Sequence, residues 1–193
     1  RGTLIRSGNT LYGTTFGTTT ADGFGTVFSL PITGGAVTTL AKFNGTNGAR
    51  PEAGVILSGN TLYGTTRTGG ANNFGAVFSV PVTGGAITTL ASFNRTNGEE
   101  PRGGLLLTNG KLYGTTLKGG SSNRGTIYSV PITGGAISTL AHFNGTNGGD
   151  AYSELTLSGN TLYGTTYGGG TSKWGTVFSI PLTGGTVSTL TSF

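Results

Sequence analysis

The chain has 193 residues, of which 39 are Gly, 11 are Lys or Arg and 6 are Asp or Glu, giving a formal net charge of +5. A chain of this length ordinarily forms one domain. Its basic residues are scattered singly, whereas nucleic-acid-binding proteins usually concentrate such charge on one stripe. The absence of Cys excludes disulfides and thiolate metal sites, and no apolar run is long enough to span a membrane. The chain opens on Arg1 with no visible signal peptide, so we expect a processed or excerpted segment.

Four copies of one sequence unit fill the chain from end to end. The run Leu-Tyr-Gly-Thr-Thr recurs in every copy and starts at Leu11, Leu62, Leu112 and Leu162. Each copy closes on a Phe, and these residues are spaced by 50 positions: Phe43, Phe93, Phe143 and Phe193. Repeats of this length are typical of propellers, solenoids and arrays, because one unit cannot bury its own apolar surfaces.

Within one copy, the apolar alternation predicts four short strands. In the second copy these cover residues 55–57, 61–66, 75–82 and 86–93. Ser58-Gly59-Asn60 is a turn signal between the first two strands. Gly84-Gly85 supplies positive-φ positions, and we interpret it as a two-residue hairpin between the last two strands. No helical periodicity is present, so four antiparallel strands per unit are expected.

Both faces of each predicted sheet carry large apolar side chains. In the third strand of the second copy, Val77 lies on one face while Phe78 and Val80 lie on the other. A sheet with two apolar faces must be covered on both sides, which is how the blades of a propeller pack. We therefore predict an all-β propeller with blades at residues 1–43, 53–93, 103–143 and 153–193. A β-solenoid with two rungs per repeat is the main alternative, although the tight Gly-rich turns favour hairpins.

The terminal copies keep the core pattern instead of ending in polar caps. Leu4 and Ile5 at one end and Leu190 and Phe193 at the other are apolar. Repeat arrays need capping or closure to hide such ends. Two closures are open: one four-bladed ring, or an eight-bladed ring made by a homodimer, and we favour the homodimer.

Catalytic, metal and cofactor sites are not expected. None of the acids recurs at an equivalent position in all four copies, and the only histidine, His142, aligns with Lys42, Ser92 and Ser192. A catalytic His needs an orienting acid and a nucleophile, and neither can be placed. The Asn-Gly segments lack the carboxylates of a Ca²⁺ loop. The sequence therefore predicts a protein that is not an enzyme.

The differences among the copies fall in two loops, one between the second and third strands and one leading to the next copy. In an antiparallel meander both loops leave the same end of the blade, and loops on a rigid scaffold commonly carry binding sites. The candidate ligand-binding residues on this face are Phe24, Arg67, Phe74, Lys118, Arg124, Tyr167, Lys173 and Trp174. Aromatic rings beside Arg and Lys suit a neutral or weakly anionic glycan. In one alternative interpretation, the aromatic residues only plug the seams between blades. In another, the whole chain is a structural, self-assembling repeat protein without a ligand.

The repeated motifs closely resemble the GloVer tandem repeat. Each copy carries Leu-Tyr-Gly-Thr-Thr, Gly-Thr-Val-Phe-Ser or a close variant, then Gly-Gly and Thr-Leu. The last three copies have a further Gly-Gly between the first two of these motifs, and the first three copies add Phe-Asn and Asn-Gly. The resemblance covers essentially the whole chain. It implies an extracellular or cell-surface protein of bacterial origin, and it brings no catalytic residues with it.

Overall fold

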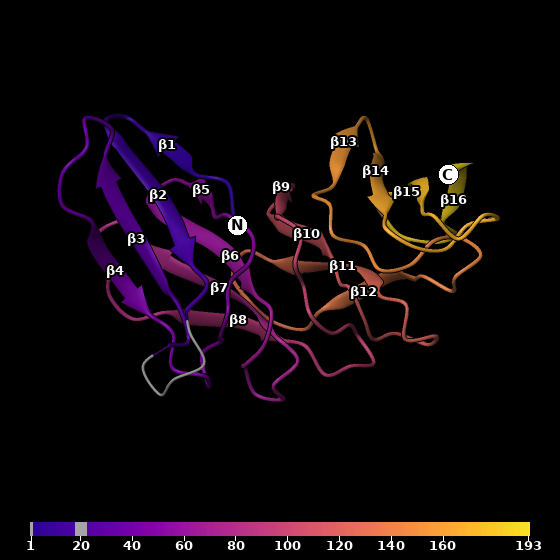
Figure 1. Cartoon of the computed structure of the whole chain (residues 1–193), viewed down its shortest axis with the longest axis horizontal. Helices are drawn as coiled ribbons and strands as arrows, with labels where there is room; N and C mark the ends of the chain where they lie inside the picture. The colour runs from indigo at the N-terminus through magenta and orange to yellow at the C-terminus, as the bar shows by residue number, and fades with distance from the viewer. Residues whose placement is uncertain (1, 18–22) are drawn as a thin grey trace.

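The computed structural model describes residues 2–17 and 23–193, and in these residues every regular element is a β-strand. The strands form four sheets of four strands each (Figure 1). In every sheet the strands follow chain order, and each pairs antiparallel with its neighbour. The expected all-β fold with four strands per repeat is confirmed. Because all strand pairing lies within single repeats, the arrangement differs from the rungs of a solenoid.

The strand bounds are close to those predicted. Sheet 1 contains β1 (Ile5–Ser7), β2 (Thr10–Thr15), β3 (Thr26–Pro31) and β4 (Thr38–Lys42). Sheet 2 contains β5 (Ile56–Ser58), β6 (Thr61–Thr66), β7 (Ala76–Pro81) and β8 (Thr88–Ser92). Sheet 3 contains β9 (Leu106–Thr108), β10 (Lys111–Thr115), β11 (Thr126–Pro131) and β12 (Ser138–His142). Sheet 4 contains β13 (Thr156–Ser158), β14 (Thr161–Thr166), β15 (Thr176–Pro181) and β16 (Ser188–Ser192).

Each seam between neighbouring sheets is an apolar core. On sheet 2, Leu62, Phe78 and Val80 pack against sheet 1, whereas Tyr63 and Val77 pack against sheet 3. A third core joins sheets 3 and 4. Every seam holds one edge-to-face aromatic pair with ring centroids about 5 Å apart: Phe43–Phe78, Phe93–Tyr128 and Phe143–Phe178. The two-sided burial expected from the alternation is therefore present.

The Gly of the Leu-Tyr-Gly-Thr-Thr run makes room for this aromatic packing. Gly64 in β6 lies opposite Phe78 in β7. A Cβ atom at Gly64 would lie only 2.7 Å from Cζ of Phe78, too close for any side chain. The glycine therefore recurs in each copy because an aromatic ring lies across it.

The loop between the last two strands of each sheet is longer than the predicted two-residue hairpin. β7 ends at Pro81 and β8 begins at Thr88. Gly84 and Gly85 do have positive φ, 82° and 127°, as predicted. The N–H of Gly84 donates to Pro81 O, while that of Gly85 donates across the seam to Leu40 O at 3.0 Å. The tight-hairpin interpretation was wrong because the second glycine bonds to the preceding sheet instead of closing a local turn.

The four sheets follow an open arc (Figure 1). β1, β5, β9 and β13 lie on its concave side, β4, β8, β12 and β16 on its convex side, and sheets 1 and 4 at its two ends. The cores formed by the described residues join sheets 1 and 2, 2 and 3, and 3 and 4. At the free ends, Leu4 is 53% exposed and Phe193 is 60% exposed. Closure into a ring is therefore not seen within this single chain.

Candidate functional site

The two variable loops meet at each seam, as the meander geometry predicted. One linker residue bridges two sheets there through its backbone. The N–H of Asp150 donates to Arg124 O at 3.0 Å, and Asp150 O accepts from the N–H of Tyr167 at 3.2 Å. Arg50 and Glu100 make the equivalent contacts at the other seams, and all three residues have φ between 54° and 57°. The loops are thus fixed to one another along the same edge of the arc.

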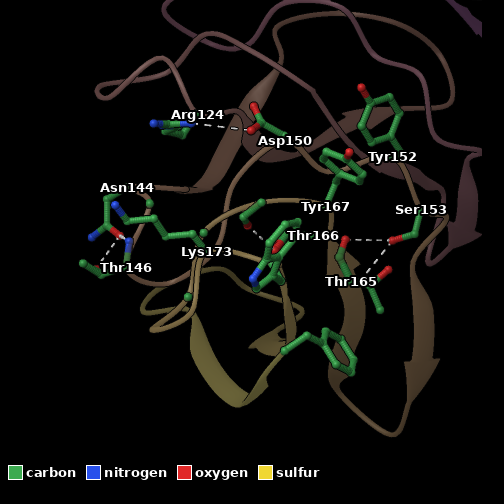
Figure 2. Close-up of a pocket in the computed structure, with 16 residues that line it drawn as sticks. Arg124, Asn144, Thr146, Asp150, Tyr152, Ser153, Thr165, Thr166, Tyr167 and Lys173 are labelled. Carbon is green, nitrogen blue, oxygen red and sulfur yellow. Dashed lines mark hydrogen bonds and ion pairs between the residues drawn. The ribbon is translucent and has the colours of Figure 1, made fainter.

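The seam between sheets 3 and 4 holds an open cleft of about 1510 Å³ (Figure 2). Four aromatic residues line it, and all four are exposed: Tyr152, Tyr167 at 75%, Trp174 at 78% and Phe193 at 60%. The rings of Tyr152 and Tyr167 meet edge to face with centroids 5.9 Å apart. The lining also includes polar side chains, among them Asn144, Ser153 and Thr165. Exposed aromatic rings beside such hydrogen-bonding groups are typical of small-ligand sites.

Charged groups lie on the rim of the same cleft. Nη1 of Arg124 lies 3.5 Å from Oδ2 of Asp150 (Figure 2). Lys173 is exposed and makes no ion pair within the described part of the chain. The Arg124–Asp150 pair is formally neutral, so Lys173 leaves the cleft with one net positive charge. Four of the eight predicted ligand-binding residues therefore lie together here: Arg124, Tyr167, Lys173 and Trp174.

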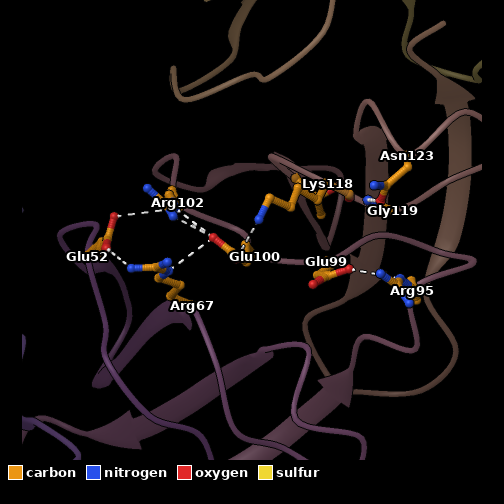
Figure 3. Close-up of polar contacts among 10 residues, drawn as sticks. Glu52, Arg67, Arg95, Glu99, Glu100, Arg102, Lys118, Gly119 and Asn123 are labelled. Carbon is orange, nitrogen blue, oxygen red and sulfur yellow. Dashed lines mark hydrogen bonds and ion pairs between the residues drawn. The ribbon is translucent and has the colours of Figure 1, made fainter. Parts of the chain in front are cut away.

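Two other predicted residues, Arg67 and Lys118, point into an ion-pair cluster between sheets 2 and 3 (Figure 3). At its centre is Glu100, which is only 8% exposed. Its carboxylate lies 3.0 Å from Nε of Arg67 and 3.3 Å from Nζ of Lys118, and it also accepts from Arg102. Arg67 contacts Glu52 in addition, at 3.4 Å. Both cations are thus paired with carboxylates of the protein, and the cluster of Arg67, Arg102 and Lys118 with Glu52 and Glu100 keeps one net positive charge.

The pKa of Glu100 is set by two opposing effects. Burial by itself would raise the pKa, because it disfavours the charged form. Hydrogen bonds from Arg102 and Arg67, together with their positive charges, outweigh burial and hold the pKa below its ordinary value of 4.5. A carboxylate with a lowered pKa stabilises the folded state above its ordinary pKa, and the stabilisation is lost as the pH falls through the folded-state pKa.

We therefore expect Glu100→Gln to lower the free energy of unfolding at neutral pH by about 1–3 kcal/mol, because it leaves three cations around an uncharged amide. The variant should also lose part of the acid-induced destabilisation that the parent shows below pH 4.5. Urea unfolding monitored by circular dichroism between pH 3 and pH 7 measures both effects.

Glu99→Gln is the matched control for that variant. Glu99 is the preceding residue, and it lies 3.2 Å from the largely exposed Arg95 without hydrogen-bond alignment. The Glu99 side chain is only 15% exposed, but its partner Arg95 is 63% exposed, and a pair with one solvent-screened partner contributes little to stability. An equal loss of stability in the two variants would contradict a central role for Glu100.

The remaining two predicted residues, Phe24 and Phe74, lie at the other seams. Phe74 packs against the core between sheets 2 and 3, and the guanidinium of Arg95 lies 5.8 Å from the centre of its ring. The ring of Phe24 lies beside Gly45, where a Cβ atom would be 3.4 Å from it. Phe74 matches the seam-plug interpretation, whereas Phe24 is 36% exposed and belongs to none of the apolar cores formed by the described residues. Trp174 occupies the same repeat position in the last copy, where no further linker of the described chain covers it.

Sequence reasoning did not select Tyr152, Asp150, Arg102 or Glu100. Tyr152 packs against Tyr167, and its ring also lies 5.5 Å below the guanidinium of Arg102. A signal was present, because the equivalent position holds Glu52 in the second copy, Arg102 in the third and Tyr152 in the fourth. Such variation within an otherwise constant repeat marks an exposed, specialised position.

No group of three or more His, Cys, Asp or Glu side chains that could hold a metal is present within residues 2–17 and 23–193. Over the same residues there is no helix of the length and apolarity required to cross a membrane.

Radially packed four-stranded antiparallel sheets define a β-propeller-like repeat protein. The chain is similar in fold to a putative TolB from Agrobacterium tumefaciens, with a TM-score of 0.61 and 16% identity, over 95% of this chain and 61% of that one. It is also similar to a chain of a nidogen–laminin complex, with a TM-score of 0.54 and 16% identity, over 90% of this chain and 72% of that one. A puromycin-hydrolysing peptidase from Mycobacterium tuberculosis matches with a TM-score of 0.63 and 15% identity, over 98% of this chain and 29% of that one. At these identities the similarity concerns the fold alone.

The chain belongs to the Gloeobacter/Verrucomicrobia repeat family, whose model matches residues 1–193. This confirms the GloVer resemblance found in the repeated motifs. Comparison with curated protein sequences finds no match.

Proposed function

We propose that the chain is a non-catalytic extracellular binding module that holds a neutral or weakly anionic glycan in the cleft between sheets 3 and 4. The observation that carries this proposal is the group of exposed aromatic side chains around one cleft, which includes Tyr152, Tyr167 and Trp174. The apolar faces of sugar rings pack on such aromatic planes, while polar groups on the rim bond the hydroxyls. The extracellular location is part of the proposal and rests only on what the resemblance to the repeat family implies.

The charges around the cleft favour a ligand of low charge. Arg124 is paired with Asp150, so Lys173 supplies the only excess positive charge on the rim. Arg67, Arg102 and Lys118 are already paired with Glu100. Strong capture of a polyanion needs concentrated positive potential, which this arrangement lacks.

We expect a Trp174→Ala/Tyr167→Ala double variant to lose glycan binding, with at least a tenfold weaker affinity for any glycan that the parent selects from an array. Both side chains are largely exposed, so the melting temperature should stay unchanged. Titration calorimetry with the selected glycan measures the affinity.

Phe24→Ala is the control, because Phe24 occupies the Trp174 repeat position at the seam between sheets 1 and 2. The affinity of the Phe24→Ala variant for the selected glycan should equal that of the parent. Undiminished binding in the double variant would refute the location of the site, and an array without any bound glycan would refute the ligand class.

The second candidate function is a structural repeat that assembles with itself. The observation favouring it is the pair of apolar sheet faces at the two ends of the arc, where Leu4 and Phe193 are exposed. Two chains could complete an eight-bladed ring with twice the 19.3 kDa mass of one chain. One chain closing as a four-bladed ring would instead have to bring sheets 1 and 4 together. Light scattering distinguishes the two masses.

A further inference from the structure

The two ends of the arc carry opposite halves of the seam that already occurs inside the chain. At the first seam, Tyr12, Val27 and Phe43 of the leading sheet pack against Leu62 and Phe78 of the following sheet. The free face of sheet 4 carries the residues that contact the following sheet in the other copies: Tyr163, Val177, Leu190 and Phe193. The free face of sheet 1 carries the residues that contact the preceding sheet in the other copies: Leu4, Leu11, Phe28 and Leu30.

These side chains are more exposed than their equivalents inside the chain. Phe193 is 60% exposed, whereas Phe93 and Phe143 are fully buried. Leu4 is 53% exposed, whereas Leu105 at the same repeat position is 2% exposed. Burying apolar surface of this kind stabilises by roughly 25 cal/mol per Å². The free faces are therefore two complementary surfaces that lack a partner within the described chain.

We propose that sheet 4 of one chain packs head to tail on sheet 1 of a second copy, and that the joint repeats the internal seam contact by contact. This proposal specifies the surface for the assembly function above and does not depend on glycan binding. The occupant is a second copy because each internal seam is formed by the same repeat positions, so the chain itself contains both halves of the interface. The two end sheets of one chain lie apart, so in this conformation they cannot bury each other's apolar faces (Figure 1).

The internal seams specify two contacts at the joint. Across each seam a backbone N–H donates to a Leu carbonyl of the preceding sheet: Gly85 to Leu40, Gly135 to Leu90 and Gly185 to Leu140, at 3.0–3.1 Å. The fourth member of this series is Gly35 of one copy donating to Leu190 of the other. In the same way, Phe193 should meet Phe28 of the second copy edge to face, as Phe143 meets Phe178 at 5.1 Å.

The joint is heterologous, since it brings together two different surfaces. Such an interface either closes into a ring or continues as a filament, depending on the rotation between copies. An isologous contact would instead place one end face of a chain against the same face of the second copy, with residue i meeting residue j and j meeting i. This difference allows a direct test with disulfides, because the chain contains no Cys of its own.

The test uses two single variants, Gly34→Cys and Leu190→Cys. At the internal seam a Cβ atom on Gly184 would lie 3.3 Å from Cβ of Leu140, close to the roughly 3.5–4.5 Å that a disulfide requires. It would also lie 2.9 Å from Leu140 O, so the two segments must separate slightly to accept the bond. Gly34 and Leu190 are the equivalent positions on the two free faces. After mixing under mild oxidation, we expect a disulfide-linked dimer on a non-reducing gel that neither variant forms alone.

The Leu140→Cys/Gly184→Cys double variant is the matched control, since it places the same pair at an internal seam. It should form an intramolecular disulfide. It also tests whether a Cys is tolerated at a positive φ, since φ is 88° at Gly184 and 82° at Gly34. Failure of the mixture to cross-link while this control does so would overturn the proposal. Cross-linking by Leu190→Cys alone would also overturn it, because that outcome indicates an isologous contact.

The mass of the unmodified chain gives an independent readout. We expect light scattering to show an assembly of two chains, and we expect Leu190→Asp to shift it to one chain without lowering the melting temperature of the monomer. A parent chain that stays monomeric at 100 µM, about a hundredfold above a 1 µM dissociation constant, would refute the joint. Neither readout involves a glycan, so failure of the joint and failure of the binding function are separable.

Discussion

Replacing Gly125 by Ala should destabilise the protein by about 2–6 kcal/mol, one of the largest effects expected from a single methyl group in this chain. Gly125 has φ +95°, where a Cβ atom is strained by about 1–3 kcal/mol. A Cβ there would also lie 2.1 Å from Thr116 O. That carbonyl belongs to the backbone and cannot move aside, so overpacking adds about 1–3 kcal/mol. Denaturant unfolding followed by circular dichroism measures the loss.

Gly59→Asn is the control for this prediction, and the chain itself supports it. Gly59 also has positive φ, 57°, but nothing lies within 4 Å of its Cβ position. The third copy carries Asn109 at the same repeat position, with φ 49°. A change of no more than about 0.5 kcal/mol is therefore expected. If Gly59→Asn cost as much as Gly125→Ala, the contact with Thr116 could not be the cause of the difference.

The fold was predictable from the sequence because its signals are local and repeated four times. The alternation in residues 75–82 places Val77 and Phe78 on opposite faces, and the structure buries both in different seams. The loop after Pro81 was not predicted correctly, because two adjacent glycines look the same in a tight hairpin and in a longer loop. What distinguishes them is the hydrogen bond from Gly85 to Leu40, a contact between repeats that no local pattern encodes.

The candidate site was predictable only in part. Meander geometry correctly placed the two variable loops together, and differences among copies identified Tyr167 and Trp174, which are exposed in the cleft. The same reasoning treated Arg67 as available for a ligand. Its nearest acid partner, Glu100, lies 33 residues away in sequence and comes from the next linker. Pairing at that separation depends on how two sheets pack, which a single sequence does not reveal.

Phe93→Ala should lower the free energy of unfolding by about 3–5 kcal/mol, because a fully buried aromatic side chain leaves a cavity when it is truncated. The ring of Phe93 is completely shielded from solvent and meets Tyr128 edge to face at 4.9 Å. Denaturant unfolding should show the loss at any protein concentration, since the seam between sheets 2 and 3 lies within one chain.

Phe193→Ala truncates the same repeat position in the last copy, where the Phe side chain is exposed and not buried. Phe193 is 60% exposed, so its truncation should cost the isolated chain about 1 kcal/mol or less. The head-to-tail joint adds a second expectation, because a side chain buried between two copies contributes to stability only where copies associate. The melting temperature of the parent should then rise with protein concentration, and Phe193→Ala should remove most of that rise while Phe93→Ala preserves it. Equal and concentration-independent losses in the two variants would show that the free face of sheet 4 is already covered within one chain.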